Sequence, residues 1–371
     1  MTAKTETLPE TLDDRALNRA LLARQMLLER KPETLPRALD RLGGLQAQEA
    51  RPPFIALWSR LEGFRREDLL TALQDRKVVK ATFTRGTLHL VSASEYLAFR
   101  STHAAVLEGA MLPEMKEMAK VVAVEDLVTA ARAALADGPL TFNALRAVLA
   151  KRWPDLNERH MGYAVRLNLP LIATPDDSQW GGKAGAAFAL ADQWLGTAPD
   201  EAGRLPEIVQ HYLAAFGPAT VADIQTFTGF KGLKPVVEAL RPELAVFRNS
   251  AGKALFDMPD APRPDADTPA PVRFLPDFDG VMLGHADRAR VISEADRKAL
   301  GNKNLRVPAV FLVDGFAAGS WSLTATKTKA TLEAKAFGTL TKAVKDELVA
   351  EGEALLRFVA PEAKTAAVVF E

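Results

Sequence analysis

The sequence contains no cysteine, so it has no disulfide, thiolate nucleophile, iron–sulfur cluster or cysteine-based zinc site. It also lacks an excess of one charge, because 47 basic residues balance 47 acidic ones. Chains that bind nucleic acid through phosphate contacts are usually strongly basic. The zero net charge therefore argues against a general polyanion binder, and the distribution of charge along the chain has to be considered before nucleic acid is excluded.

Long apolar runs are absent as well. No segment approaches the roughly 18 apolar residues that span a bilayer, and the first 15 residues lack the apolar core of a secretory signal. We therefore expect a cytoplasmic protein without membrane contact. The five histidines are scattered without metal-ligand spacing, and no phosphate-binding or dinucleotide-binding glycine motif occurs. We expect no metal and no cofactor.

The charges are unevenly distributed. Residues 1–120 hold 19 basic and 16 acidic side chains, whereas residues 121–270 hold 14 and 18. Locally, four positive charges and no negative one fall within ten residues, at Arg76, Lys77, Lys80 and Arg85. Such a run predicts either a solvated face or a contact surface for phosphates.

A pattern recurs three times in the first two-thirds of the chain. In each copy an apolar-faced helix is followed by Pro-x-Thr and a second helix, with the threonines at 34, 141 and 220. Proline cannot continue a helix, and threonine is a natural N-cap for the next one. The prolines lie 107 and 79 residues apart, so the copies are of domain size.

The third copy predicts what each unit is. Thr220 caps a short helix that ends at Gly229, a second helix containing Pro235 follows, and two strands then flank the turn at residues 249–252. A helix, a helix–turn–helix and a two-stranded wing make a winged-helix domain. The other two copies fit this order. The first copy has predicted helices at 34–42, 53–62 and 66–74 and strands at 78–83 and 87–91. The second copy has predicted helices at 141–151 and 157–168 and strands near 171–174 and 186–190.

The predicted fold class is therefore α+β, with three tandem winged-helix domains followed by a C-terminal mixed α/β domain. The predicted domains are residues 14–120, 121–200 and 201–258, a Pro/Asp-rich linker at 259–271, and a C-terminal domain at 272–371 with a basic hairpin. Winged helices bind DNA or mediate protein contacts, so the fold leaves both functions open.

The segment between the first two helices of the first copy is unusually long. Gly43 and Gly44 end one helix and Pro52 suits the start of the next. Between them Gln46 and Gln48 stand two residues apart, so both amides point the same way in an extended stretch. Two amides can hold one water molecule, or they can satisfy backbone groups of the loop.

The first wing contains the stretch Thr-Arg-Gly-Thr-Leu-His. Alternation places Arg85, Thr87 and His89 on one face of the wing. A polar, cationic face there predicts contacts with phosphates or a base edge, and an exposed strand face is the alternative.

These motifs recur together in one family. Gly-Leu-Gln-Ala-Gln, Thr-Arg-Gly-Thr-Leu-His-Leu, Leu275-Pro-Asp-Phe-Asp279 with Gly284-His285, and Val313-Asp314-Gly315 before Trp321 resemble the AlkZ-like (YcaQ-type) winged-helix DNA glycosylases. The resemblance spans about Ala16 to Phe370. It implies a C-shaped, DNA-embracing protein in which Gln46 and Gln48 match the catalytic Gln-x-Gln.

The chemistry of the residues fits this function. A neutral amide is no general base, so the pair suits a reaction with a good leaving group, such as hydrolysis of the N-glycosidic bond of a cationic N7- or N3-alkylated purine. We expect a monofunctional glycosylase for DNA repair that can also unhook interstrand crosslinks. Without an evident catalytic lysine, we expect no Schiff base and no strand-cleaving lyase step.

We expect the partner to be double-stranded DNA with a damaged base, bound by a monomer associated with the nucleoid. The candidate DNA contacts are Arg51, Arg76, Lys77, Lys80, Arg85, Thr87, His89, Arg288, Arg290, Lys327 and Lys329, where Arg288 and Arg290 can instead pair with Asp287. Lys327 and Lys329 are expected at a hairpin tip suited to a minor-groove wedge. The alternatives are a non-catalytic winged-helix DNA-binding or regulatory protein and a protein-interaction scaffold.

Overall fold

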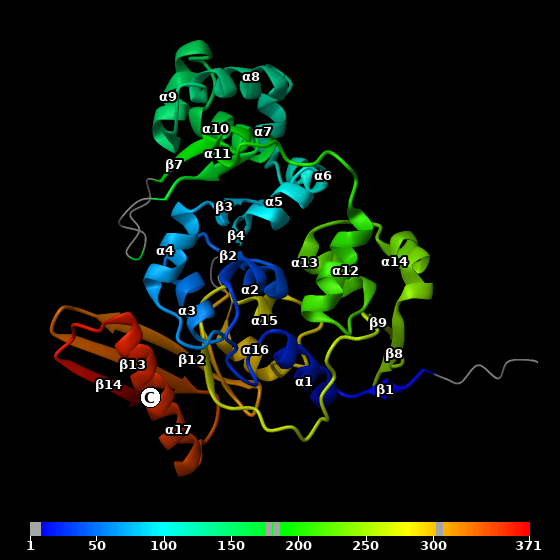
Figure 1. The fold of residues 1–371 in the computed structure, drawn as a ribbon, viewed down its shortest axis with the longest axis vertical. Coiled ribbons are helices and arrows are strands. Elements are labelled where there is room, and N and C mark those ends of the chain that lie inside the picture. Colours follow the sequence, from blue (N-terminus) through cyan, green and yellow to red (C-terminus); the bar gives the residue numbers. More distant parts are fainter. Residues whose placement is uncertain (1–8, 176–179, 181–185, 302–306) are drawn as a thin grey trace, which may run out of the picture. The chain divides into compact units, whose positions relative to one another are not determined.

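The computed structural model describes residues 9–175, 180, 186–301 and 307–371 (Figure 1). It forms two compact units. The first comprises residues up to Pro32, Ile55–Glu62 and Val209–Glu371, and the second comprises Glu33–Phe54 and Gly63–Ile208. The chain passes from one unit to the other at residues 32–33 and 62–63, and also within α3 (Pro52–Trp58) and α12 (Leu205–Phe216).

The second unit is built on a six-stranded antiparallel sheet with the order β2-β4-β3-β6-β7-β5. Its strands are β2 (Leu45–Gln46), β3 (Val78–Thr82), β4 (Leu88–Ser92), β5 (Leu140–Thr141), β6 (Leu171–Ala173) and β7 (Ala187–Leu190). The two hairpins predicted as separate wings thus join in one sheet, because Lys80 pairs with Ala173 and Ala81 with Ile172.

Helices cover this sheet. They are α2 (Leu35–Leu42), α4 (Arg66–Gln74), α5 (Ala93–Phe99), α6 (Ala104–Gly109), α7 (Pro113–Met118), α8 (Val124–Leu135), α9 (Phe142–Arg152), α10 (Glu158–Asn168) and α11 (Ala191–Leu195). Of these, α2, α4, α9 and α10 lie close to predicted positions. Figure 1 shows α8, α9, α10 and α11 near β7.

The core of this unit lies on both faces of the sheet. In β6, Leu171 and Ala173 belong to the cluster formed with α8, α9 and α10, whereas Ile172 between them belongs to a second cluster with Val79 and Tyr96. Successive side chains of a strand point to opposite faces, so this short strand connects the two clusters.

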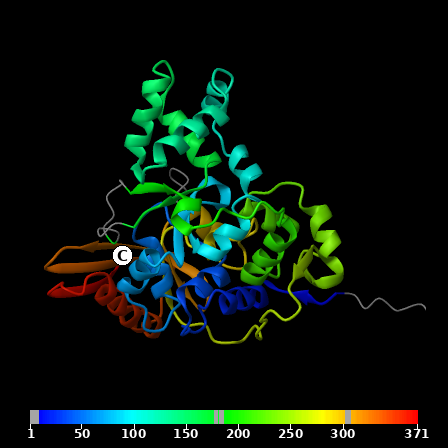
Figure 2. The same cartoon turned by 45° about the horizontal axis from the view of Figure 1, so that its top comes forward.

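The first unit contains two further sheets. β1 (Thr11–Leu12) pairs in parallel with β8 (Ala245–Asn249), which pairs with β9 (Ala254–Asp257). The other sheet has the order β10-β11-β12-β13-β14, and α17 (Lys342–Val359) runs along it in Figures 1 and 2. Its strands are β10 (Arg273–Leu275), β11 (Val310–Val313), β12 (Phe316–Ala325), β13 (Lys329–Ala336) and β14 (Thr365–Phe370), and the remaining helices of the unit are α1 (Asp14–Arg24), α13 (Val221–Thr228), α14 (Lys234–Leu240), α15 (Gly280–Leu283) and α16 (Glu294–Leu300).

The predicted helix caps have different outcomes. Thr220 and Asp223 form a capping box at the start of α13, and Gly229 ends that helix with φ of 83°. Thr141 caps α9 by accepting from Ala144 N at 3.1 Å. Thr34 is the N-cap residue of α2, as predicted, but its side chain makes no capping hydrogen bond. The winged-helix count and the predicted domain boundaries stay predictions.

Several family motifs of the first unit have structural roles. Asp279 pairs with Arg60 through two hydrogen bonds of 2.7 and 2.9 Å, and both side chains are fully buried. Asp314 pairs with Arg15 and Arg19. His285 donates from Nε2 to the carbonyl of Phe216 at 2.9 Å, since a carbonyl only accepts. These motifs hold distant segments of the chain together.

Candidate active site

The glutamine pair lies at the edge of the six-stranded sheet. Gln46 is the last residue of β2, where it pairs with His89 of β4. Gly44 lets the chain enter this strand, because its φ is 78° and a Cβ there would lie 2.9 Å from Val91 Cγ1. The loop between β2 and α3 then holds Gln48, which is exposed to solvent. The structure therefore brings the predicted pair to a water-accessible edge.

The two amides are hydrogen bonded to each other. Gln46 Nε2 donates to Gln48 Oε1 at 2.6 Å, and Arg85 Nη2 donates to Gln46 Oε1 at 3.4 Å. A guanidinium can only donate, so the Gln46 atom that faces Arg85 must be the carbonyl oxygen, and its NH₂ group must face Gln48. Arg85 thus determines the orientation of both amides.

This orientation leaves acceptors available. Each amide oxygen has two lone pairs, and one on each is used by the hydrogen bonds from Arg85 and Gln46. The two remaining lone pairs can accept both hydrogens of one water molecule. The oxygen lone pairs of that water would then point away from the amides, as attack on an electrophilic carbon requires.

Arg85 and His89 beside the pair have lowered pKa values. Burial lowers the pKa of Arg85 to about 10, which leaves its charge intact at neutral pH. Burial, and secondarily the charge of Arg85, lowers the pKa of His89 to about 3. His89 Nδ1 lies 3.0 Å from the Thr87 carbonyl and donates to it, so the imidazole is neutral with a defined tautomer.

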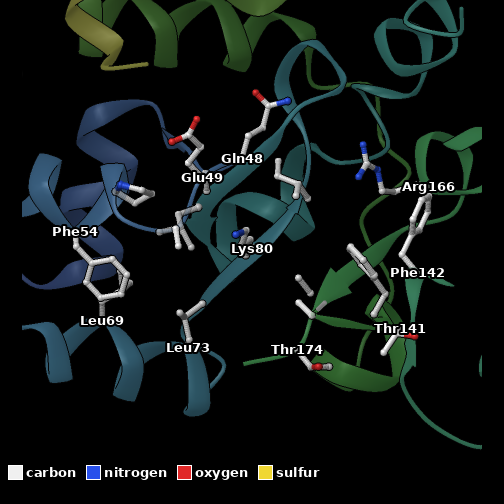
Figure 3. Close-up of a pocket in the computed structure, with 18 of the residues that line it drawn as sticks. Gln48, Glu49, Phe54, Leu69, Leu73, Lys80, Thr141, Phe142, Arg166 and Thr174 are labelled. Atoms are coloured by element: carbon white, nitrogen blue, oxygen red, sulfur yellow. The ribbon is translucent and has the colours of Figure 1, made fainter. Parts of the chain in front are cut away.

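A cavity of about 660 Å³ adjoins Gln48. Figure 3 shows Gln48 and Glu49 from the glutamine loop on one side and Arg166 and Phe142 on the other, with Lys80 between them. Apolar walls come from Phe54, Leu69, Leu73 and Phe188. A cavity with apolar walls and a few polar groups is the usual form of a small-ligand site. Sequence reasoning missed Glu49 and Arg166, although Glu49 directly follows Gln48.

The predicted basic run does not form one surface. Arg76 lies 4.5 Å from the Trp194 ring and donates to the Trp194 carbonyl, Lys77 pairs with Asp75 at 3.1 Å, and Lys80 lines the cavity. The strand alternation and a tight turn direct these neighbours to different places.

Two of the predicted DNA contacts, His89 and Arg290, are buried. His89 is only 2% exposed and neutral, because Thr84–Gly86 forms a 3₁₀ turn with Arg85 at φ of 55° and the strand resumes at Leu88. Arg290 is 5% exposed and donates to the Pro218 carbonyl at 2.8 Å. Neither side chain presents a donor to a phosphate at the surface.

The other predicted contacts are more accessible. Thr87 and Arg288 are half-buried, and Arg51 is exposed with its guanidinium 5.8 Å from the Trp180 ring. Lys327 lies in the turn between β12 and β13, and Lys329 begins β13, so both occupy the predicted hairpin tip. Their contacts with DNA stay predictions.

Two further observations concern metals and membranes. Within residues 9–175, 180, 186–301 and 307–371, no group of three or more His, Asp or Glu side chains has the arrangement of a metal site. Across the same ranges, no helix has both the length and the apolar character required for crossing a bilayer.

The hydrogen-bonded amide pair lies beside this cavity, and two neutral amides there can position a water molecule. The DNA glycosylase AlkZ-like family model matches residues 39–358, and the chain belongs to this family. It is 28% identical over 323 residues to an interstrand DNA cross-link repair glycosylase of Streptomyces sahachiroi, which covers 79% of this chain and 84% of that protein.

The fold is also similar to that of a solved structure. Streptomyces sahachiroi DNA glycosylase AlkZ superimposes with a TM-score of 0.78 at 20% sequence identity, covering 97% of this chain and 100% of that one. The predictions of an α+β fold, of membership in this family and of a DNA repair glycosylase are confirmed.

Proposed function

We propose that this protein is a monofunctional glycosylase that releases cationic N7- or N3-alkylated purines from double-stranded DNA and unhooks interstrand crosslinks. The supporting observation is the Gln46–Gln48 hydrogen bond of 2.6 Å beside the cavity. An alkylated purine already has a positive charge, so it leaves without protonation, and the amides need only position water and stabilise the oxocarbenium-like sugar through their carbonyl dipoles. The name of the Streptomyces relative supports the extension to crosslinks.

Binding is proposed to involve three winged-helix domains (residues 14–120, 121–200 and 201–258) and the hairpin of the C-terminal domain, acting as a monomer on nucleoid DNA. Arg51, Lys80, Lys327 and Lys329 are proposed phosphate or groove contacts, since their positive charges attract the DNA backbone. The modest number of such residues gives a reversible grip, which suits an enzyme that searches for rare lesions.

The test is an assay of abasic sites. The protein is incubated with a duplex containing one N7-methylguanine, with a matched undamaged duplex and with a duplex crosslinked between guanine N7 atoms, and abasic sites are cleaved by hot alkali. We expect release from both damaged duplexes and none from the undamaged one. Binding without release from either lesion would favour a non-catalytic DNA-binding protein.

The same assay without alkali tests for a lyase step. The sequence predicts no lyase step, because it shows no evident catalytic lysine. Lys80, however, lines the cavity and is therefore the lysine to test. Strand cleavage without heat, together with a covalent complex trapped by borohydride and lost in Lys80→Gln, would identify a bifunctional enzyme instead.

The proposed mechanism predicts a rate that is independent of pH. The glutamines do not titrate, Arg85 with a pKa of about 10 stays charged, and His89 with a pKa of about 3 stays neutral. Single-turnover release of 7-methylguanine at constant ionic strength should therefore be flat between about pH 6 and 8.5. A rate that rises with pH through this range would instead indicate a general base and contradict the mechanism.

A further inference from the structure

A second cavity, of about 490 Å³, lies beside the turn that contains Arg85. Its walls come from this turn, from the segment around α7 and from α10. Three arginines line it, Arg85, Arg159 and Arg166, together with His160. Glu114 is the carboxylate among the residues that line it. The cavity thus has a local surplus of positive charge within a chain whose net charge is zero.

The arginines of α10 are held in place by a tyrosine. Arg159, Tyr163 and Arg166 occupy positions i, i+4 and i+7, which lie on one face of a helix. The guanidinium carbon of Arg166 lies 4.7 Å from the Tyr163 ring centroid, and that of Arg159 lies 5.7 Å from it. A guanidinium stacked on an aromatic ring keeps its N–H groups at the rim for another partner.

The donors of these arginines exceed the acceptors around them. Among the described residues, neither Arg159 nor Arg166 forms an ion pair, and Arg166 Nε is buried without a hydrogen-bond partner. Glu158, the first residue of the same helix, pairs with Arg146 at 3.6 Å. Asn157 already caps the helix by accepting from Arg159 N and His160 N. The positive charge at this cavity therefore belongs to side chains and is not neutralised within the helix.

Two of the arginines connect this cavity with the candidate active site. Arg85 Nη2 donates to Gln46 Oε1 at 3.4 Å, and Arg166 lines both the second cavity and the cavity beside Gln48 (Figure 3). A ligand bound between Arg85 and Arg166 would therefore lie one side chain away from the glutamine pair.

We propose that the cavity between α7, α10 and the Arg85 turn binds the phosphodiester backbone of the DNA strand that holds the damaged base. Arginine matches phosphate in a bidentate geometry, and phosphate contacts fix the register of a protein on DNA without reading its sequence. A phosphate held here places a neighbouring sugar at the glutamine pair, which is the positioning that the hydrolysis requires. This proposal rests on the proposed glycosylase function.

The experiment measures the Kd for an undamaged duplex by fluorescence anisotropy over a series of salt concentrations. Arg159→Gln and Arg166→Gln should each weaken binding about threefold to tenfold and lower the slope of log Kd against log salt by about one, since each removes one phosphate contact. Glu114→Lys should strengthen binding, because it removes the carboxylate and adds a cation to the same wall. The matched control is Arg152→Gln on α9, where an exposed arginine stacks on Trp153 away from the cavity.

Unchanged Kd values and slopes in Arg159→Gln and Glu114→Lys would overturn the proposal. Arg159 and Glu114 are exposed, so these two variants remain informative if Arg166→Gln fails to fold. A further arm tests inorganic phosphate. If phosphate raises the melting temperature of the wild type but not of Arg159→Gln while the duplex Kd is unchanged, the cavity binds a free anion and the proposal is wrong.

A single-turnover assay on 7-methylguanine duplex at saturating protein separates this proposal from the proposed function. Weakened binding in the variants together with base release by the wild type supports both. Weakened binding without any release by the wild type supports the DNA site and contradicts the glycosylase function. Release by the wild type with unchanged binding in the variants contradicts only the DNA site.

Discussion

Replacing Gln46 or Gln48 with alanine is expected to lower the single-turnover rate of 7-methylguanine release by about 10²–10³-fold, the usual cost of removing one group that stabilises or positions a transition state. The two amides form one hydrogen-bonded unit with Arg85. Removing Gln46 leaves Gln48 without its donor, and removing Gln48 takes away one of the two acceptors for the water. The double variant should therefore lose little more than either single variant, because groups that act as a unit are not additive.

Binding must be measured on the same variants. Gln48 is exposed and Gln46 is half-buried, and neither has a charge, so the Kd for the duplex and its salt dependence should stay at the wild-type values. Gln74→Ala is the matched control, because Gln74 is an exposed glutamine at the end of α4 that does not line the cavity. Full activity in Gln46→Ala and Gln48→Ala would place the catalytic groups elsewhere and contradict the proposed mechanism.

Removing the carboxylate of Asp279 is expected to lower the free energy of unfolding of the first unit by about 3–5 kcal/mol, since it leaves the buried charge of Arg60 without its partner. Asp279 also accepts from Val281 N at the start of α15, and Arg60 Nε is buried without a hydrogen-bond partner. The pair joins residues 219 positions apart. The measurement is the urea midpoint of Asp279→Ala followed by circular dichroism.

A double variant separates the loss of the ion pair from the cost of leaving the Arg60 charge buried without a partner. Arg60→Met with Asp279→Ala removes both charges and should be more stable than Asp279→Ala alone, because the uncompensated charge is gone. Glu294→Gln is the control, since it breaks an exposed pair with Lys298 and should change stability by less than about 1 kcal/mol. If Asp279→Ala unfolds at the same urea concentration as the wild type, the buried pair contributes nothing to stability.

The local elements could largely be predicted from the sequence. The helices and hairpins depend on apolar periodicity and on residues such as Thr220 and Gly229, whose effects extend over a few positions. The pairing of β3 with β6, which merges two predicted wings, could not be predicted. It joins strands about 90 residues apart through backbone hydrogen bonds, and these leave no pattern in side-chain order.

The candidate site, too, could be predicted only in part from the sequence. The spacing of Gln46 and Gln48 predicts that their amides lie together, and they form a hydrogen bond. The roles of Arg85 and His89 depended on how the chain turns at Thr84–Gly86. This turn directs one side chain to Gln46 and buries the other, so a strict strand alternation misplaced them.

The sequence by itself determined the absence of thiol chemistry, the order of helices and strands, the family resemblance and the amide pair. Those properties follow from composition and from spacing over a few residues. Only the tertiary structure decided where each charged side chain lies. Some charged groups lie beside the glutamines, others are buried in ion pairs, and others line the cavity between α7, α10 and the Arg85 turn. The zero net charge of the chain is a sum over all side chains, whereas binding depends on the few whose charges the fold brings together.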